Sequence, residues 1–207
     1  MSSGLPGWLN TWQELGMQAA DEALYERLMV CWSEPHRRYH TLHHLRECLT
    51  TFDEVREQAQ RPGEIDLALW FHDAFYDPLR HDNEERSAQW ARDAVLEAGL
   101  PQDVADRVYA LVMATRHEGT PEDPDARLLV DVDLASLGAD AKRFDDDDLQ
   151  IRAEYAHVPE PEYRVGRRRV LGNFLARPRL YSTDYFHDAL EERARDNLRR
   201  AIARLES

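Results

Sequence analysis

The sequence predicts an all-α fold, arranged as a compact bundle of helices. Three observations support this: the 207-residue chain has only 9 glycines, it shows no β-hairpin signal, and its apolar residues recur every three or four positions. This length fits one domain that can bury a core. Within residues 1–207 we expect an N-terminal helical extension (1–34), a core (35–140) and C-terminal helices (141–207).

The N-terminal half contains three expected helices. Trp8 to Trp32 repeats apolar residues at helical spacing, and Gly16 is a point where this helix could divide. After Pro35, a second helical pattern runs to about Gln60. The third stretch, Ile65 to Tyr76, is almost continuously apolar, which predicts a buried central helix.

Helix start and stop signals divide the rest of the chain. They predict helices over about Asn83–Ala98, Pro101–Arg116, Ala126–Leu137, Pro161–Ala176 and Ser182–Glu206. The acidic run Asp145–Asp148 lacks the glycine and the closing glutamate of a calcium-binding EF-hand loop, so we expect it to be a solvated helix start.

Composition excludes some partners. The net charge of −14 argues against a nucleic-acid partner, because binding phosphate backbones needs an excess of Lys and Arg. No apolar run reaches about 18 residues, and Met1 to Asn10 has no leader pattern, so we expect a cytoplasmic protein without membrane contacts. Cys31 and Cys48 lie in helical patterns without a CxxC, which favours core thiols in a reducing compartment over a disulfide.

Three groups of potential metal ligands lie in separate helical segments. His40 and His44 are four residues apart, which would place them on one helical face. The pair His72-Asp73 lies in the apolar central stretch, and Asp131 and Asp133 lie in another apolar segment. Buried groups of this kind need hydrogen bonds or a metal. Each could instead be a core histidine or a salt-bridge partner, so it is their combination that points to a metal site.

Imidazole and carboxylate ligands together suit Mn²⁺, Fe²⁺, Co²⁺, Ni²⁺ or Zn²⁺, whereas oxygen ligands alone favour Mg²⁺ or Ca²⁺. We therefore expect one divalent transition metal, with Mg²⁺ as an addition and a second metal as an alternative. Such a cation activates water for attack on phosphorus. No Gly-x-Ser-x-Gly, Walker or Gly-x-Gly-x-x-Gly motif offers another chemistry.

The order of histidine, His-Asp pair and later aspartate resembles the HD superfamily of metal-dependent phosphohydrolases. This resemblance implies an all-helical fold with the metal between its central helices, and His44, His72, Asp73 and Asp133 as ligands. The stretch Tyr39-His40-Thr41-Leu42-His43-His44 also resembles the Tyr-His-Asn-x-x-His opening of cyclic-nucleotide phosphodiesterases. That likeness makes His40 the proton donor, so that His40 and Asp73 are the expected catalytic residues.

From about Tyr39 to Leu205 the chain resembles a branch of uncharacterised predicted HD phosphohydrolases. The motifs that carry this likeness are Arg-x-Tyr-His-x-x-x-His, Phe-His-Asp-x-x-Tyr-Asp, Asp82-Asn83-Glu84-Glu85-x-Ser87-Ala88, Ala114-Thr115-Arg116-His117, Asp131-x-Asp133-Leu134, Gly166-Arg167-x-x-Val170-Leu171 and Glu192-x-x-Ala-Arg195-x-Asn197-Leu198. The family's final aspartate usually precedes Arg or Lys and then leucine, whereas Leu134 follows Asp133 directly. Asp131 therefore stays an alternative ligand.

Several further residues have two readings each. His81 and His117 could hold a second metal, or lie in a loop and at a helix C-terminus. Glu84, Glu85 and Asp77 could orient a metal-bound water or a ligand, or cap helices. Arg164 and Arg168 belong to a basic run that could bind phosphate. The same run, which also includes Arg167 and Arg169, could instead pair with surplus carboxylates.

The sequence thus predicts a metal-dependent phosphohydrolase, a phosphomonoesterase or phosphodiesterase, whose substrate is a small phosphate ester such as a nucleotide. The alternatives are a non-catalytic, nucleotide-binding regulatory protein and a di-iron enzyme of the oxygenase type found among HD relatives. The expected partner is a small molecule. The first helix, Trp8 to Trp32, could cover the core or form a homodimer.

Overall fold

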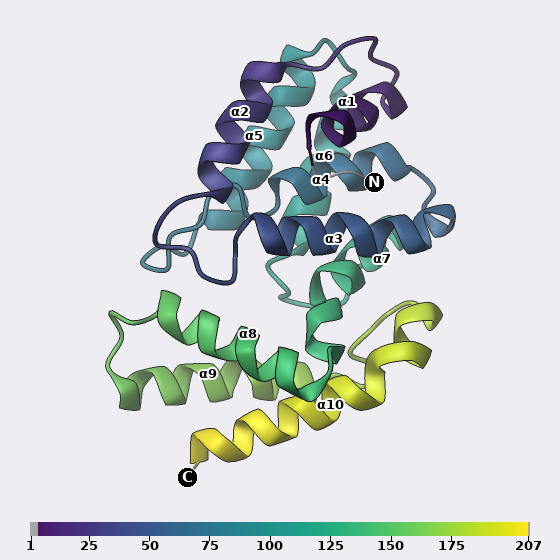
Figure 1. Cartoon of the computed structure of the whole chain (residues 1–207). Helices are drawn as coiled ribbons and strands as arrows, with labels where there is room; N and C mark the ends of the chain where they lie inside the picture. The colour runs from purple at the N-terminus through teal and green to yellow at the C-terminus, as the bar shows by residue number, and fades with distance from the viewer. Residues whose placement is uncertain (1–3, 207) are drawn as a thin grey trace. The chain divides into compact units, whose positions relative to one another are not determined.

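The computed structural model describes residues 4–206, and within them the chain is all-α, which confirms the predicted fold class (Figure 1). Residues 1–3 and 207 lie outside the described part, and with them the first residues of the Met1–Asn10 stretch. The chain divides into two compact units between Val132 and Asp133. The single domain stays a prediction.

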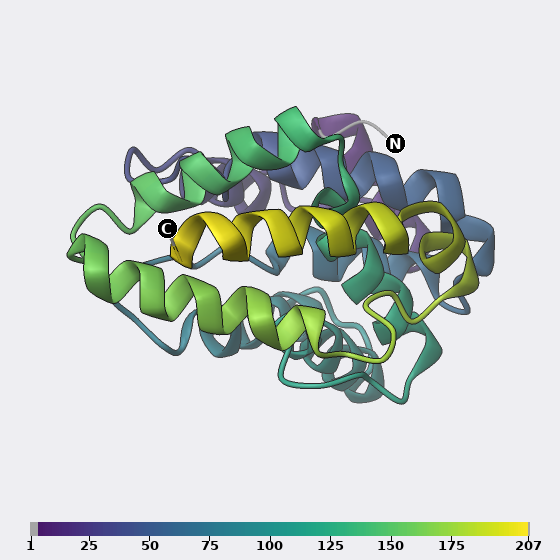
Figure 2. The ribbon, with the colours of Figure 1, turned by 90° about the horizontal axis from the view of Figure 1, so that it is seen from below.

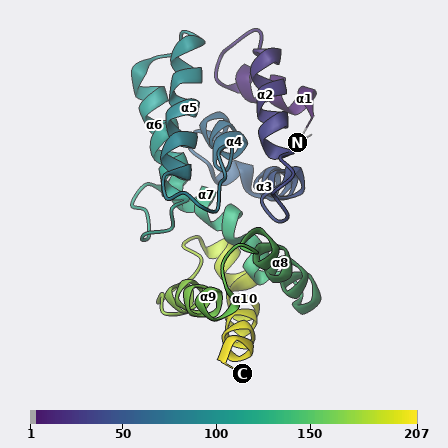
Figure 3. The same ribbon diagram turned by 90° about the vertical axis from the view of Figure 1, so that its left-hand side faces the viewer.

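The first unit is built around α4 (Pro62–Phe71). Its other elements are α1 (Leu5–Glu14), α2 (Glu22–Trp32), α3 (Leu42–Val55), the 3₁₀ turn η1 (Arg56–Gln58), α5 (Asn83–Glu97), α6 (Gln102–Ala114) and α7 (Pro124–Asp133). Every residue of α4 after Pro62 is buried, and α1, α3, α5 and α6 pack against it. Figure 3 shows α4 with α5 and α6 on one side and α1 and α2 on the other. The predicted central helix is therefore present.

The expected N-terminal helix is divided at Gly16, as its sequence allowed. Gly16 has φ +89°, a left-handed conformation that glycine adopts without steric cost. α1 then packs on α4 through an aromatic cluster, in which the ring of Trp8 lies 5.5 Å from those of Trp12 and Trp70 in edge-to-face contacts. This segment covers the core of the first unit.

The central helix ends five residues earlier than expected, so its predicted end at Tyr76 is wrong. The backbone after Phe71 bonds to side chains instead of continuing the helix. The buried guanidinium of Arg37 donates to the carbonyls of Asp73 (2.7 Å) and Ala74 (3.0 Å). The N–H of Phe75 donates to Ser87 Oγ at 3.0 Å. These contacts hold an irregular segment in which His72 and Asp73 lie.

Other predicted boundaries also shift. α3 begins at Leu42, because the side chain of Thr41 caps it by accepting from the N–H of His43. It ends at Val55 and is followed by η1, so the expected end near Gln60 is wrong. Likewise α7 ends at Asp133, where a 3₁₀ helix, η2 (Leu134–Gly138), follows.

The second unit comprises η2, α8 (Ala141–Glu154), α9 (Glu160–Leu175) and α10 (Asp184–Glu206). α10 packs against both α8 and α9 (Figure 2). Gly138 allows a close approach to α10, since a Cβ there would lie 2.7 Å from the Cβ of Leu190. Nearby, the side chain of Asn197 donates to the carbonyls of Leu137 and Ala139. This unit is therefore held by buried polar contacts as well as apolar ones.

The acidic run is not a helix start, which corrects that prediction. Asp140 caps α8 by accepting from the N–H groups of Lys142 and Arg143, and the run lies inside the helix. Basic side chains pair with its four carboxylates: Lys142 with Asp146, Arg143 with Asp147, Arg167 with Asp148, and Arg200 and Arg204 with Asp145. No helix within residues 4–206 combines the length and apolar character that a membrane crossing requires.

Candidate metal centre

Two buried histidines of the first unit face each other. His44 lies in the first turns of α3 and is 3% exposed, and His72 follows the last residue of α4 and is 1% exposed. Their Nε2 atoms are 3.2 Å apart. Nδ1 of His72 lies 2.8 Å from the carbonyl oxygen of Leu69. Because a carbonyl only accepts hydrogen bonds, Nδ1 carries the proton in neutral His72, and the lone pair on Nε2 points toward His44.

A carboxylate completes this contact. Oδ2 of Asp73 lies 3.3 Å from Nε2 of His72 and 3.8 Å from Nε2 of His44. Each Nε2 offers one hydrogen or one lone pair, so the two rings either share one hydrogen bond or both turn lone pairs toward a common cation. In the second arrangement Asp73 would supply a further lone pair to the same cation.

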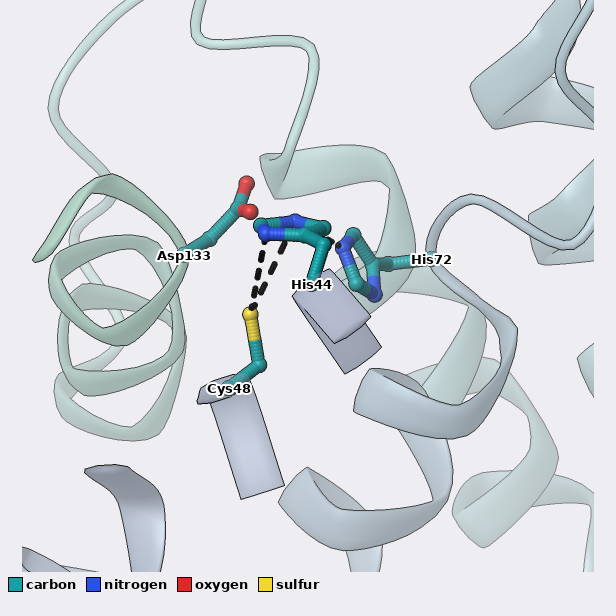
Figure 4. A group of neighbouring side chains, drawn as sticks. All are labelled: His44, Cys48, His72 and Asp133. Carbon is teal, nitrogen blue, oxygen red and sulfur yellow. Dashed lines mark hydrogen bonds between the residues drawn. The ribbon is translucent and has the colours of Figure 1, made fainter. Parts of the chain in front are cut away.

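Asp133 brings a carboxylate from a third helix. It is the last residue of α7, whose other residues belong to the first unit. The start of α7 is tied to the start of α4, since the carboxylate of Asp125 accepts from the N–H groups of Gln60 (2.8 Å) and Arg61 (2.9 Å). His44, Cys48, His72 and Asp133 each offer a ligand atom, and these atoms all lie within 4.8 Å of one another. Figure 4 shows the four side chains converging.

The spacing of these atoms fits a metal ion. Two histidine nitrogens bound at about 2.0–2.1 Å in a tetrahedral site lie about 3.3 Å apart. The two Nε2 atoms are 3.2 Å apart, and Asp73 Oδ2 is 3.3 Å from one of them. The group could therefore hold a metal, with His72 oriented by its bond to Leu69 in the way that metal-bound histidines commonly are.

His40 lies beside this group but not on the helix. It precedes the capping residue Thr41, so the prediction that His40 and His44 share a helical face is wrong. The two rings are nevertheless 6.0 Å apart. The ring of His40 stacks on Tyr76 at 4.1 Å. Arg37 holds this arrangement, because its guanidinium donates to the carbonyl of His40 (3.1 Å) as well as to that of Asp73.

Sequence reasoning did not foresee Cys48 in this group. Cys48 lies on α3 and is 2% exposed, and its Sγ is 3.6 Å from Nε2 of His44. Its signal was present in the sequence: it follows His44 by four residues, so both point from one face of a helix. Both cysteines are free thiols, and Cys31 is only half-buried.

The structure places other predicted residues in separate roles. Asp131 is fully buried but two residues from Asp133 on α7, which turns it toward a different face. Asp77 lies in the loop between α4 and α5, and its carboxylate accepts from the N–H of Leu79, an Asx-turn contact that caps no helix. His43 is exposed and lies 3.4 Å from Glu47.

The remaining candidates are more peripheral. Glu84 and Glu85 lie in the first turn of α5, where the helix dipole stabilises negatively charged carboxylates. His81 is exposed in the preceding loop. His117 follows α6 with φ +56°, a left-handed conformation. Their part in a second metal site stays a prediction.

The two arginines expected to bind phosphate contact the end of α10. Arg164 donates to the carbonyls of Leu205 (3.0 Å) and Arg204 (3.2 Å), and Arg168 lies 3.8 Å from Glu206. Cations are favourable near a helix C-terminus. These contacts are those of a structural pair, and phosphate binding stays a prediction.

Comparisons with protein-family models, with curated proteins and with solved structures give no significant match. The resemblance to the HD superfamily therefore stays a prediction, carried by the motifs and by the side chains that the fold brings together.

Proposed function

We propose that this protein is a metal-dependent phosphohydrolase of the HD type, acting on a small phosphate ester such as a nucleotide or a related metabolite. In this proposal His44, His72, Asp73 and Asp133 hold one divalent transition metal. The observation that carries it is the meeting of two buried imidazoles and their neighbouring carboxylates from α3, α7 and the end of α4. Within residues 4–206, the group of His, Cys, Asp or Glu side chains that could hold a metal ion includes His44, His72 and Asp133.

When bound, a divalent cation polarises a phosphoryl oxygen and makes water more acidic. The protein's own residues would do the rest. His40 would hold a proton near the departing oxygen, since its ring is kept beside His44 by stacking on Tyr76. Arg37 would fix the spacing between His40 and Asp73, because its guanidinium bonds to the backbone of both.

The first test is the metal content of the purified protein, measured by elemental mass spectrometry. We expect about one transition metal per chain in the wild type and its loss in His72→Ala, because a ligand is removed. His43→Ala is the matched control, since His43 is also a histidine of α3 but is exposed and lies against Glu47. It should keep the metal. Circular dichroism of each variant checks that it is folded.

The second step is a screen of phosphomonoesters, phosphodiesters and nucleotides with the metal found. Hydrolysis that is lost in His72→Ala and reduced in His40→Ala supports the proposal. Saturable nucleotide binding without product would favour a non-catalytic regulatory protein. Two irons per chain with oxygen uptake would favour the di-iron alternative. A wild-type protein that is metal-free and binds neither Mn²⁺, Co²⁺ nor Ni²⁺ would contradict the enzyme reading.

A further inference from the structure

Cys48 lies where a metal ligand would lie. It is one helical turn after His44 on α3, and both side chains are buried. Figure 4 shows its sulfur directed at the imidazole of His44. Sγ is 3.6 Å from Nε2 and 3.8 Å from Nδ1 of that ring.

The distance from Sγ to Nε2 equals one edge of a coordination tetrahedron, although Sγ lies beside the ring. A metal in line with the Nε2 lone pair would hold the sulfur about 5 Å from Nδ1. The ring of His44 therefore has to turn for both groups to bind one ion. With metal–nitrogen bonds of about 2.0–2.1 Å and a metal–sulfur bond of about 2.3 Å, tetrahedral geometry places nitrogen and sulfur about 3.6 Å apart. The distance from Sγ of Cys48 to Nε2 of His44 is 3.6 Å. The same tetrahedron gives about 3.3 Å between two nitrogens, and the Nε2 atoms of His44 and His72 are 3.2 Å apart.

A core thiol with a weak hydrogen bond is the simpler account of Cys48. It leaves Nε2 of His44 crowded, because that atom also lies 3.2 Å from Nε2 of His72 and 3.8 Å from Oδ2 of Asp73. One ring nitrogen carries one hydrogen or one lone pair, and so makes one good hydrogen bond. A single cation among the sulfur, the nitrogens and the oxygen would serve all of these groups at once.

We propose that Cys48 is a ligand of the metal together with His44, His72 and Asp133, in the position that the proposed function gives to Asp73, and that the site consequently selects a thiophilic ion, Zn²⁺, over Mn²⁺ and Mg²⁺. This inference rests on the proposed function, which supplies the metal but leaves its identity open. Sulfur ligands select soft and borderline ions, whereas carboxylates and water suit Mn²⁺ and Mg²⁺. The sulfur binds as thiolate: the metal–sulfur bond forms and the thiol proton passes to solvent.

The test is the absorption spectrum of the Co²⁺-loaded protein. A thiolate bound to Co²⁺ gives a charge-transfer band in the near ultraviolet that nitrogen and oxygen ligands do not give. We expect this band in the wild type and in Cys31→Ser, which removes the other cysteine. Cys48→Ser should bind Co²⁺ without the band. Its Zn²⁺ affinity should fall on the order of 100-fold, because removing a ligand costs at least as much as removing a group that supports one, while its Mn²⁺ affinity changes little.

The outcomes separate this inference from the function on which it rests. Co²⁺ bound to the wild type without the near-ultraviolet band overturns the role of Cys48 and leaves the proposed metal site standing. A wild type that binds no Co²⁺ overturns both. A band that persists in Cys48→Ser but vanishes in Cys31→Ser also overturns the inference. The wild-type spectrum decides the matter even if Cys48→Ser does not fold.

Discussion

Each unit buries a carboxylate beside an arginine, but the two carboxyl groups behave in opposite ways. Asp66 of α4 contacts Arg56, and burial raises the pKa of Asp66 to about 6, although Arg56 opposes the shift. Burial acts on Glu191 of α10 as well. The N–H groups of Leu180 and Tyr181, and then Arg195, outweigh it and hold the pKa of Glu191 below its ordinary value.

The difference lies in how many donors reach each carboxylate. Both oxygens of Glu191 accept backbone hydrogen bonds at 3.0 Å, and Arg195 adds a contact at 2.6 Å. Oδ1 of Asp66 is buried and has no hydrogen-bond partner within residues 4–206. One arginine therefore does not compensate a buried charge, whereas several fixed donors do. The comparison makes Glu191 a structural anchor and Asp66 a pH-sensitive group.

Removing the anchor should have the largest effect. Glu191→Ala leaves the N–H groups of Leu180 and Tyr181 and the guanidinium of Arg195 without their acceptor. We expect the free energy of unfolding to fall by about 4 kcal/mol, as in other broken buried pairs. Urea titration followed by far-ultraviolet circular dichroism measures this change. Glu192→Ala is the control, since Glu192 is exposed on the same helix.

All five tryptophans precede residue 132 and so report on the first unit. If Glu191→Ala shifts the tryptophan fluorescence transition as much as the circular dichroism transition, the units unfold together. A shift smaller than about 1 kcal/mol in both signals would contradict the role of Glu191 as an anchor.

The contribution of Asp66 to the free energy of unfolding should depend on pH. Because the pKa of Asp66 is raised on folding, the folded state binds more protons between its ordinary value of 3.8 and about 6. Stability from this group is therefore full at low pH and is lost as the pH rises through this window. Across this pH window the free energy of unfolding of the wild type should fall by on the order of 3 kcal/mol relative to that of Asp66→Asn.

Urea titrations at several pH values, followed by tryptophan fluorescence, give this difference. Asp93→Asn serves as the matched variant, because Asp93 is an exposed aspartate of α5. A difference between wild type and Asp66→Asn that stays constant from pH 4 to 7 would mean that Asp66 is ionised in the folded protein throughout.

Arg37 should show a smaller effect on stability with a separate effect on the metal. Lysine at this position keeps the charge but lacks the planar fork that reaches the carbonyls of His40, Asp73 and Ala74 together. We expect Arg37→Lys to lower the free energy of unfolding by about 2 kcal/mol. We also expect weaker metal binding, measured by competition with a chelator. Arg38→Lys, the exposed neighbour, should change neither, and equal effects in both variants would refute this role.

Periodicity, together with helix start and stop signals, predicted the all-α fold and most helices, because burial of one face repeats at the helical spacing within each segment. The boundaries that failed depend on distant residues. The end of α4 at Phe71 is set by Arg37, which binds the carbonyl of Asp73, 36 residues further along the chain. A local sequence pattern does not predict a contact between residues so far apart in the chain.

Polar residues in apolar surroundings indicated the three groups of the candidate site, and the resemblance to the HD superfamily then singled out His44, His72 and Asp133. Cys48 was not predicted, because a cysteine at an apolar position of a helix has the same pattern whether it packs in a core or faces a ligand. His40 was placed on α3 by spacing, yet Thr41 caps the helix one residue later. Side-chain capping, rather than periodicity, decided its position.

The burial of α4 on every side also bears on the order of folding. A helix without a solvent face exposes apolar surface all round until α1, α3, α5 and α6 have packed against it. Exposed apolar surface of this kind makes a partly folded chain prone to aggregate. His72 follows the end of α4 and His44 lies on α3, so the two imidazoles meet only when α3 has packed against α4. Formation of the metal centre is thus coupled to formation of the core of the first unit.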